Sequence, residues 1–418
     1  MSLPNFSMNC TEKFIPTMTD CDVLVVGAGP VGALAALLLA RRGHRVIIID
    51  REATISDSPR AVVYLPQSLG SLKEAGILGD LRARGLIPST GPGWRYVSDH
   101  KVVAELDPFA LKLEDNPQPA ILLGQDLLIE IIAKHLRECG VEIQFNHELR
   151  GLRQENDKVI VTTDTTEFTA SFVIGADGAR SGVRKALNID FEGFTHPINF
   201  MAVNFRYSDI QATGFNEAQF IMDPKEKIED ANFAIILRTG IGDVWRCAYG
   251  DAGTLSDEEM KARLPQKLKA ILPLHPDPSQ YEVLQAQRYR IHQRCASSFV
   301  QGRVLLAGDA AHVNNPVGGM GLNTGLLDAH AASAAILRTY AGEPVEKELS
   351  GYDTVRRGVF TEFVNPMTID NLRRLWEKSE EADGKLRNGF FGMLNNSKDF
   401  QRMAQLSMNK MAQGVPGY

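Results

Sequence analysis

Three glycines and one acid near the start of the chain have the types and spacing needed to bind a dinucleotide. Gly27, Gly29 and Gly32, with Pro30 between them, form the pattern Gly-x-Gly-x-x-Gly. Glycine allows a tight turn and lets a pyrophosphate approach the backbone, and the following helix points its unpaired N–H groups at the anion. Asp50 lies 18 residues after Gly32, where a carboxylate can accept hydrogen bonds from ribose hydroxyls. We therefore expect a dinucleotide here rather than a bare structural turn.

A second block combines an acid with a later helix start. Gly308 and Asp309 follow an apolar run, and the chain continues to Pro316 and then to Gly321, Leu322 and Asn323. An acid at such a turn can hold a hydroxyl of a polyol chain, and a helix start can face a polarised carbonyl. The alternative for Asp309 is a structural helix cap.

A third block also ends an apolar run in glycine and an acid. Asp177 and Gly178 are followed closely by Arg180. A guanidinium is a planar, permanently charged group suited to phosphate recognition. The alternative is a surface arginine that opens a short helix.

These three blocks, in this order, resemble those of the group A flavoprotein monooxygenases, the p-hydroxybenzoate hydroxylase-like aromatic hydroxylases. The resemblance runs from about residue 22 to residue 340, and it includes Arg60 and Gln125, which sit where the family has an arginine and a glutamine facing the flavin. Asp50 stands where glutamate is commoner in the family, although Arg51 follows it as usual. The resemblance implies non-covalent FAD.

The resemblance also assigns roles to these residues. The ADP half of FAD is held by the first glycine block and Asp50, and the ribityl–phosphate region by Gln125 and Asp309. Pro316 lies near the isoalloxazine, and the backbone of 321–323 faces its pyrimidine carbonyl. Asp177, Gly178 and Arg180 serve both FAD and a passing NADPH or NADH. The expected cofactor-binding residues are Gly27, Gly29, Pro30, Gly32, Asp50, Arg51, Arg60, Gln125, Asp177, Gly178, Arg180, Gly308, Asp309, Pro316, Gly321, Leu322 and Asn323.

The implied activity is hydroxylation of a phenolic or other aromatic small molecule. In this family NAD(P)H reduces the flavin, and dioxygen then forms a C4a-hydroperoxyflavin that delivers oxygen to the ring. A dry pocket has to protect that species. The alternatives are a related FAD-dependent epoxidase, oxidase or reductase, or a flavin-containing binding protein without turnover. The substrate, the choice between NADPH and NADH, and the oligomeric state, a homodimer included, stay open.

Four residues are candidates for the substrate pocket, although none is assigned a catalytic role. Trp245, Arg246 and Tyr249 lie on one expected strand, whose alternation puts Trp245 and Tyr249 on one face and Arg246 on the other. One face should roof the flavin, and ordinary sheet packing is the alternative. His312 follows Asp309 closely and could carry a proton, but a structural role is favoured.

The elements that position these residues indicate an α/β protein. Buried strand patterns at 23–26 and 46–49 enclose a helix at 30–42, as in a βαβ unit. Alternating runs between 191 and 289 indicate an antiparallel sheet. We expect a flexible arm (1–20), a discontinuous Rossmann-like FAD-binding domain (21–190 and 290–345), an inserted antiparallel-sheet substrate domain (191–289) and a C-terminal helical region (346–418).

Composition excludes several other classes. The chain has 418 residues, 44% of them hydrophobic and 23% charged, with a net charge of −6. The charge gives no field that favours nucleic acid, and glycines interrupt the uncharged stretch 23–40, so no membrane insertion is expected. The five cysteines form no Cys-x-x-Cys pair, so we expect no metal site, no disulfide framework and a reducing, cytoplasmic location.

Overall fold

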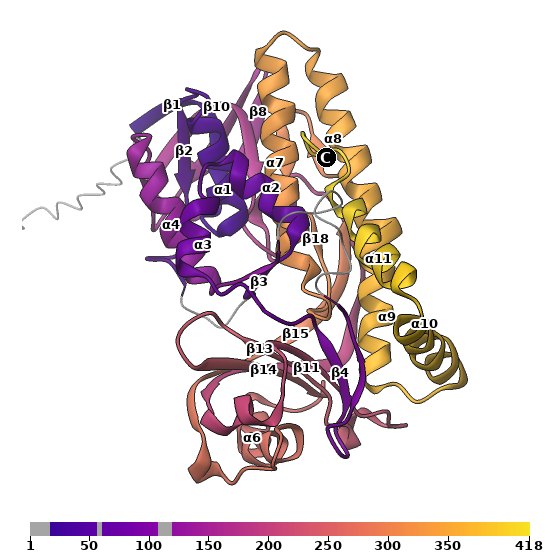
Figure 1. Cartoon of the computed structure of the whole chain (residues 1–418). Helices are drawn as coiled ribbons and strands as arrows, with labels where there is room; N and C mark the ends of the chain where they lie inside the picture. The colour runs from indigo at the N-terminus through magenta and orange to yellow at the C-terminus, as the bar shows by residue number, and fades with distance from the viewer. Residues whose placement is uncertain (1–16, 57–60, 108–118) are drawn as a thin grey trace, which may run out of the picture.

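The computed structural model describes residues 17–56, 61–107 and 119–418, and these form two large sheets with helices around them (Figure 1). The first sheet has the strand order β16-β17-β10-β1-β2-β7, and the β8–β9 hairpin pairs with β10. Its strands are β1 (Thr17–Val26), β2 (Val46–Ile49), β7 (Ile143–Gln144), β8 (Leu149–Glu155), β9 (Lys158–Thr163), β10 (Thr166–Gly175), β16 (Val300–Gln301) and β17 (Val304–Leu306).

The centre of the first sheet is parallel, and its strands have the apolar runs that such burial requires. Strands β17, β10, β1, β2 and β7 pair in parallel, one beside the next. Val23, Leu24 and Val25 are fully buried, as expected for a strand covered on both faces. Because these five strands are parallel, their carboxyl ends meet at one edge of the sheet, where ligands bind in open α/β sheets.

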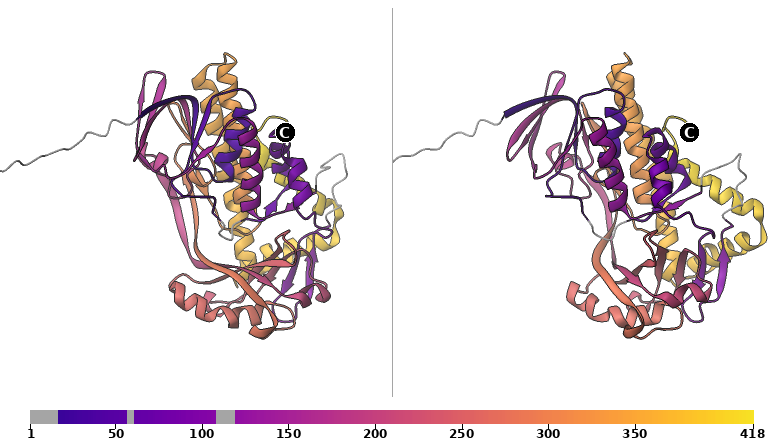
Figure 2. Two further views of the ribbon diagram at one scale, coloured as in Figure 1. Left: turned by 90° about the vertical axis from the view of Figure 1, so that its left-hand side faces the viewer. Right: turned by 60° about the vertical axis from the view of Figure 1, so that its left-hand side comes forward.

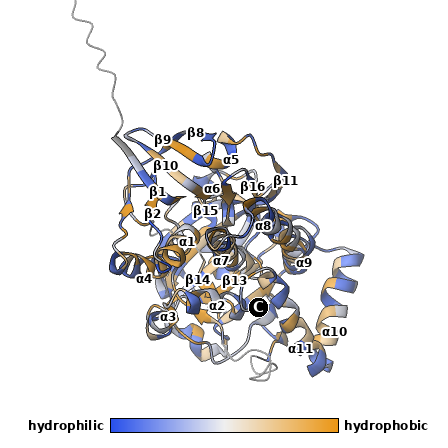
Figure 3. Cartoon of the chain, turned by 90° about the horizontal axis from the view of Figure 1, so that it is seen from above, coloured by the Kyte–Doolittle hydropathy of each residue, from blue (hydrophilic) through white to orange (hydrophobic). Residues whose placement is uncertain are grey.

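Helix α1 packs directly on the first sheet, against β1, β2 and β10. Helix α1 has Pro30 in its first turn, where a missing N–H costs nothing, and it packs against α4 and α7. Seen from above, α7 lies at the centre of the molecule, whereas α10 and α11 lie at its edge (Figure 3). The helices of this part are α1 (Pro30–Ala40), α2 (Pro66–Glu74), α3 (Leu78–Arg84), α4 (Gln125–Glu138), α5 (Gly182–Ala186) and α7 (Met320–Tyr340).

The second sheet lies at the opposite end of the molecule from the tips of α7 and α8 (Figure 2). Its order is β18-β15-β11-β14-β13-β12-β4-β5, and its pairs are antiparallel except for β12 with β4. Helix α6 (Asp257–Ile271) covers its outer face. The strands are β4 (Gly93–Tyr96), β5 (Val102–Glu105), β11 (Phe191–Arg206), β12 (Ala218–Met222), β13 (Ala234–Arg238), β14 (Val244–Ala252), β15 (Glu282–Ala296) and β18 (His312–Val313).

Three details differ from the expected domain boundaries. The end of β15 and the whole of β18 fall within the expected FAD-binding segment 290–345, but both belong to the second sheet. β1 begins at Thr17, so the last four residues of the expected arm are strand. Strands β4 and β5 fall within the expected first domain, but they complete the second sheet because the edge of β12 pairs with β4. A separate two-stranded sheet joins β3 (Val63–Tyr64) to β6 (Ile121–Leu122) between the two large sheets.

The rest of the chain is helical and packs along both sheets. Leu372, Leu375, Phe391 and Leu394 join the apolar cluster on the inner face of the second sheet. The elements are α8 (Val345–Val359), α9 (Asn365–Trp376), α10 (Phe390–Asn396) and α11 (Lys398–Ser407), with π-helical stretches at Phe360–Val364 and Ala382–Gly389. Within the described ranges, no helix has the length and apolar character needed to cross a bilayer.

Candidate functional site

The three glycine blocks converge at the carboxyl ends of neighbouring strands β1, β10 and β17. A Cβ placed on Gly27 would lie 2.4 Å from the carbonyl oxygen of Ala176, so the first block packs directly on the Asp177 block. A Cβ on Gly308 would lie 2.9 Å from Val31, so the Asp309 block packs against the first turn of α1. Residues about 280 positions apart thus share one site.

The first glycine turn has the shape of a phosphate cradle. Gly27 has a φ of +105°, and a Cβ on Gly32 would lie 1.9 Å from the Gly27 carbonyl oxygen, so both positions require glycine. A Cβ placed on Gly29, by contrast, would have no other atom within 4 Å. Gly29 is the N-cap of α1, without a side-chain cap and without an acid in the first turn. The open space therefore faces uncapped helix N–H groups, which fits a pyrophosphate.

Asp50 faces this turn from the end of β2. Its carboxylate accepts hydrogen bonds from the backbone N–H of Ala28 at 2.6 Å and of Glu52 at 2.9 Å. The acid is thereby fixed beside the glycine turn, where the adenosine ribose would lie. Arg51 is exposed and pairs with Glu52.

The Asp177 carboxylate organises its own block. It accepts hydrogen bonds from the backbone N–H groups of Gly182 at 2.6 Å and Val183 at 3.1 Å, and from the Ser181 hydroxyl at 2.5 Å. Burial raises the pKa of Asp177, although these hydrogen bonds oppose the rise. Gly178 has a φ of +78°, and Arg180 is exposed.

Arg184, which the sequence analysis did not single out, ties two of the blocks together. Its guanidinium donates to the carbonyl of Ala310 at 2.7 Å and to that of Ala179 at 3.0 Å, and it lies over the ring of Phe191. It is 4% exposed. A cation seven residues after Asp177, in a helix turn next to the block, was the signal available in the sequence.

Asp309 lies within a short 3-10 turn, Gly308–Ala310, and its side chain is exposed at the meeting point of the blocks. The residue before α7 is Gly319, in the left-handed conformation, so Asp309 does not cap that helix. This placement argues against a cap on α7 as the role of Asp309.

The start of α7 is a second helix N-terminus open to a ligand. Its N-cap has no side-chain hydrogen bond and its first turn has no acid, and Gly321 and Leu322 lie in that turn, with Pro316 four residues before it. Asn323, by contrast, is fully buried and its side chain is used within the fold. Its amide donates to the carbonyls of Val63 and Gly319, and its oxygen accepts from the N–H of Leu65 and the hydroxyl of Ser68.

Two residues were expected to face the flavin, and the structure describes only one of them. Gln125 is the first residue of α4 and is half-buried. Arg60 lies outside the described residues.

The structure separates the four substrate-pocket candidates, and Trp245 and Tyr249 take the alternative of ordinary sheet packing. Trp245 and Tyr249 are at most 1% exposed and pack with α6 residues such as Met260 on the outer face of the second sheet. They do not reach the space between the sheets, because strand alternation directs them away from it. Strand alternation places Arg246 on the opposite, inner face of β14, together with Ala248.

His312 does not reach the space between the two large sheets either. It is buried between Phe299 and Phe360, and its Nε2 lies 2.6 Å from Asp328 Oδ2. Asp328 also accepts hydrogen bonds from Arg356 Nε at 2.8 Å and from the Gly308 N–H at 3.2 Å. This buried triad supports the Gly308 turn from behind, so the favoured structural role fits His312. Asp328 is the one acidic residue of α7, and this was its signal in the sequence.

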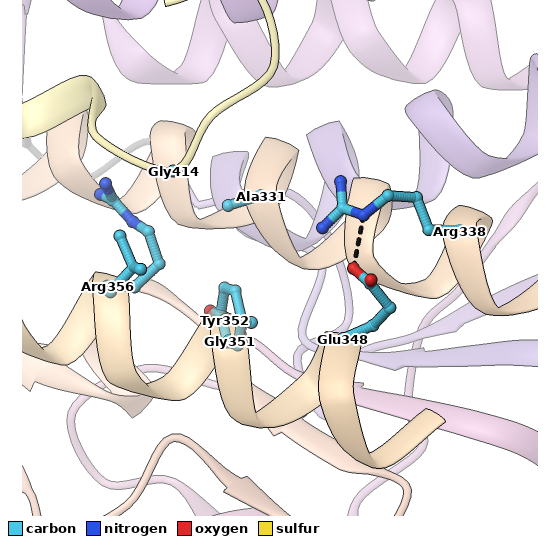
Figure 4. A pocket seen from close by; sticks show the side chains of 8 residues that line it. Ala331, Arg338, Glu348, Gly351, Tyr352, Arg356 and Gly414 are labelled. Carbon is cyan, nitrogen blue, oxygen red and sulfur yellow. Dashed lines mark hydrogen bonds and ion pairs between the residues drawn. The ribbon is translucent and has the colours of Figure 1, made fainter. Parts of the chain in front are cut away.

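A pocket of about 210 Å³ lies elsewhere, between α7, α8 and Gly414 (Figure 4). Its facing charges, Arg338 and Glu348, pair with each other at 2.5 Å, and Arg356 reaches from it to Asp328. None of its lining residues belongs to the glycine blocks. Among the described side chains, no group of three or more His, Cys, Asp or Glu is arranged to hold a metal ion.

Comparison with known proteins identifies relatives of the same length. A family model described as an FAD binding domain matches residues 20–366. Para-nitrophenol 4-monooxygenase of Pseudomonas sp. (strain WBC-3) is 35% identical over 396 residues, which cover 93% of this chain and 95% of that protein. A 6-hydroxy-3-succinoylpyridine 3-monooxygenase of Pseudomonas putida is 35% identical over 395 residues, which cover 91% and 95%.

Solved structures agree with this result. The crystal structure of a p-nitrophenol 4-monooxygenase from Pseudomonas putida superposes with a TM-score of 0.88 at 34% identity, covering 94% of this chain and 99% of that one. A flavin-dependent monooxygenase in complex with FAD and substrate has a TM-score of 0.74 at 21% identity, covering 95% and 72%, and so shares the fold.

Proposed function

The chain belongs to the FAD-binding, flavin-dependent aromatic monooxygenases, and from this membership we propose that it hydroxylates a phenolic small molecule with a reduced nicotinamide and dioxygen. The observation that carries the proposal is the convergence of the three glycine blocks at one edge of the first sheet. The relatives' names both specify a ring that has a hydroxyl group and a second substituent.

The residues on this edge divide the binding of FAD between them. The N-terminus of α1 would hold the pyrophosphate, Asp50 the adenosine ribose, Asp309 the ribityl chain, and the N-terminus of α7 the pyrimidine carbonyl. When bound, FAD supplies the electron transfer and oxygen activation. The protein orients the ring and excludes water, and the apolar inner face of the second sheet, with Phe200, Ile235 and Ala248, suits that task.

The direct test starts from the purified protein, which we expect to be yellow with non-covalent FAD. NADPH and NADH oxidation would be measured with and without a panel of phenols under ¹⁸O₂, with mass spectrometry of the products. Phenol-stimulated oxidation with one labelled oxygen in the product is expected. Oxidation without incorporation would instead indicate an oxidase, and no turnover with any donor would indicate a binding protein.

A basic group beside the Asp177 block supports nicotinamide binding. The pKa of His292 is lowered by partial burial and then by the nearby charges of Arg294, Arg290 and Arg180. Arg180 and Arg290 are exposed. Several guanidinium groups at an exposed edge suit the phosphates of NADPH or NADH.

Arg180→Ala is therefore expected to lower kcat/KM for the reduced nicotinamide about thirty-fold, equivalent to about 2 kcal/mol, while FAD stays bound. Rapid-mixing reduction by NADPH, compared with reduction by dithionite, isolates this step. Arg150→Ala, which changes an exposed arginine paired with Glu148, is the matched control. Reduction of Arg180→Ala by NADPH at the wild-type rate would leave Arg180 without a role in coenzyme binding.

Asp309→Ala is expected to weaken FAD binding about 10- to 100-fold, because charge-assisted hydrogen bonds to the ribityl hydroxyls are lost. Fluorescence titration of the apoprotein with FAD measures this change. The thermal midpoint of the apoprotein should stay within about 1 °C of the wild type, since exposed substitutions have small effects. A large drop in that midpoint with unchanged FAD affinity would contradict the prediction.

A further inference from the structure

Residues 408–418, which we call the strap, form a segment to which the sequence analysis assigned no function. The strap runs beside α7 and α8 (Figure 1) and begins with the 3-10 turn Met408–Ala412. Met411, Ala412 and Val415 are at most 3% exposed, and they pack in the apolar cluster of the first sheet and its helices. The strap is therefore docked on the FAD-binding half of the molecule, although it follows α11 in the chain.

Arg356 of α8 joins the strap to α7. It is fully buried, and its Nη1 donates hydrogen bonds to the carbonyl oxygens of Met411 at 2.6 Å and Gln413 at 2.9 Å. Its Nε donates to Asp328 Oδ1 at 2.8 Å, and its Nη2 donates to the carbonyl oxygen of Thr324 at 3.4 Å. One planar, charged group thus holds the strap and two successive turns of α7 in a fixed relation.

These two turns of α7 are connected to the groups that we assign to FAD. Asp328 Oδ2 accepts a hydrogen bond from the N–H of Gly308 at 3.2 Å, and the Gly308 turn is the one that presents Asp309. The Thr324 hydroxyl donates to the carbonyl of Met320, the first residue of α7, at 2.8 Å. The Gly308 turn and the N-terminus of α7 are therefore each one residue away from Arg356, which itself holds the strap.

The strap is also bonded to α2. The side-chain amide of Gln67 donates to Asn409 Oδ1 at 2.9 Å, and the N–H of Gly70 donates to the Tyr418 hydroxyl at 2.9 Å. Helix α2 is in turn bonded to Asn323 of α7. The strap thus fastens both α2 and α8 to α7, whose N-terminus we assign to the flavin pyrimidine.

Release of the strap would disturb this arrangement at its centre. Arg356 Nη1 would lose both of its acceptors, and a buried charged donor without an acceptor is costly. The guanidinium would have to turn toward water, and Asp328 would then lose its arginine partner. The pocket of about 210 Å³ lies against the strap and is lined by Gly414 and Arg356 (Figure 4), so this side of the strap is not closely packed.

We propose that the strap retains the cofactor. Docked, it holds the Gly308 turn and the start of α7 in the arrangement that binds FAD; released, it lets FAD dissociate. Arg356 is the positioning residue that couples the two. Because coupling between sites is reciprocal, bound FAD also keeps the strap docked. This inference rests on the FAD binding of the proposed function and on none of its oxygen chemistry.

The experiment measures how fast the holoenzyme exchanges its FAD for an excess of labelled FAD, below the unfolding temperature of the apoprotein. Val415→Asp puts a charge at a buried strap position, so it is expected to undock the strap. FAD dissociation should become about 10- to 100-fold faster, as is typical of coupling between sites. Val102→Asp is the matched control, because Val102 is 47% exposed on β5, and it should change the rate less than about twofold.

Two glycines of the strap provide a second, milder pair of variants. Gly414 has a φ of +79°, and a Cβ there would lie 2.6 Å from Cγ1 of Val355 in α8, whereas Gly417 has a φ of +83° and nothing within 4 Å. Alanine strains the backbone at both positions, but only Gly414→Ala pushes the strap away from α8. Gly414→Ala should speed FAD dissociation about 5- to 10-fold, and Gly417→Ala less than about twofold.

Reciprocity and the role of Arg356 have their own readouts. In the wild type, the amides of residues 408–418 should exchange hydrogen for deuterium about fivefold or more slowly in the holoenzyme than in the apoprotein. Arg356→Lys keeps the charge without the planar fork. Val415→Asp should therefore speed FAD dissociation much less in the Arg356→Lys background than in the wild type. Effects that multiply in full would overturn the assignment of Arg356.

Met260→Ala is the control for general loss of stability, since Met260 is fully buried under α6 on the outer face of the second sheet. Wild-type dissociation of FAD in both Val415→Asp and Gly414→Ala overturns the proposal. Equal acceleration by Met260→Ala at the same loss of thermal midpoint, or equal deuterium exchange of the strap with and without FAD, also overturns it. A protein that retains FAD through the strap but hydroxylates nothing would disprove the proposed function alone.

Discussion

Asp328→Asn is expected to lower the free energy of unfolding by about 3–5 kcal/mol, because it removes the only carboxylate from a buried charge cluster. Asp328 and Arg356 are both fully buried, and their Oδ1 and Nε atoms lie 2.8 Å apart. The substitution keeps the shape of the side chain but leaves the guanidinium without a counter-charge. Urea unfolding of the apoprotein measures the change as a shift in midpoint at constant slope.

The matched control is Asp157→Asn, because the Asp157 side chain is 87% exposed although it also pairs with an arginine. Its effect should stay within about 0.5 kcal/mol. Burial alone would raise the pKa of Asp328, but Arg356 and His312 hold it below its ordinary value. Its contribution is therefore present above the unfolded carboxyl pKa of about 3.9 and is lost as pH falls through the lower folded value. Equal stability of variant and wild type at neutral pH would contradict this account.

Gly32→Ala is expected to yield protein without FAD, with affinity reduced more than about 100-fold. A Cβ at this position would lie 1.9 Å from the Gly27 carbonyl oxygen, which is backbone and has no room to move. The turn would have to open, and the uncapped N–H groups of α1 would lose their alignment on the pyrophosphate. The absorbance ratio of bound flavin to protein measures the loss.

Gly351→Ala is the control, since Gly351 lies in helix α8 with nothing within 4 Å of the added methyl. Alanine there is expected to preserve FAD content and to stabilise the helix slightly. Full FAD occupancy in Gly32→Ala would show that the turn does not carry the pyrophosphate.

Local patterns made the first glycine block readable from sequence. A buried strand, the glycine turn, helix α1 and Asp50 occupy one short stretch, and Gly27 and Gly32 have no room for a side chain. Membership of the family followed from three such blocks in order. The βαβ unit and the second, largely antiparallel sheet were predicted for the same reason.

What sequence reasoning missed depends on contacts between distant segments. Nothing near Trp94 indicates that its strand pairs with residues about 125 positions later. Strand alternation separated Trp245 from Arg246, but only the packing of α6 decides which face is covered and which meets the first sheet. The support of the Gly308 turn by Asp328 and Arg356 likewise arises from the arrangement of α7 and α8.

The two long strands β11 and β15 also determine how the molecule can move. They pair with each other along almost their whole length, apart from shifts in register between Thr195 and Asn199 and between Asn204 and Phe205. Hinge closure of domains needs a few residues free to change their backbone angles. A hinge in this connection would have to bend β11 and β15 together, because their backbone hydrogen bonds join them into one ribbon.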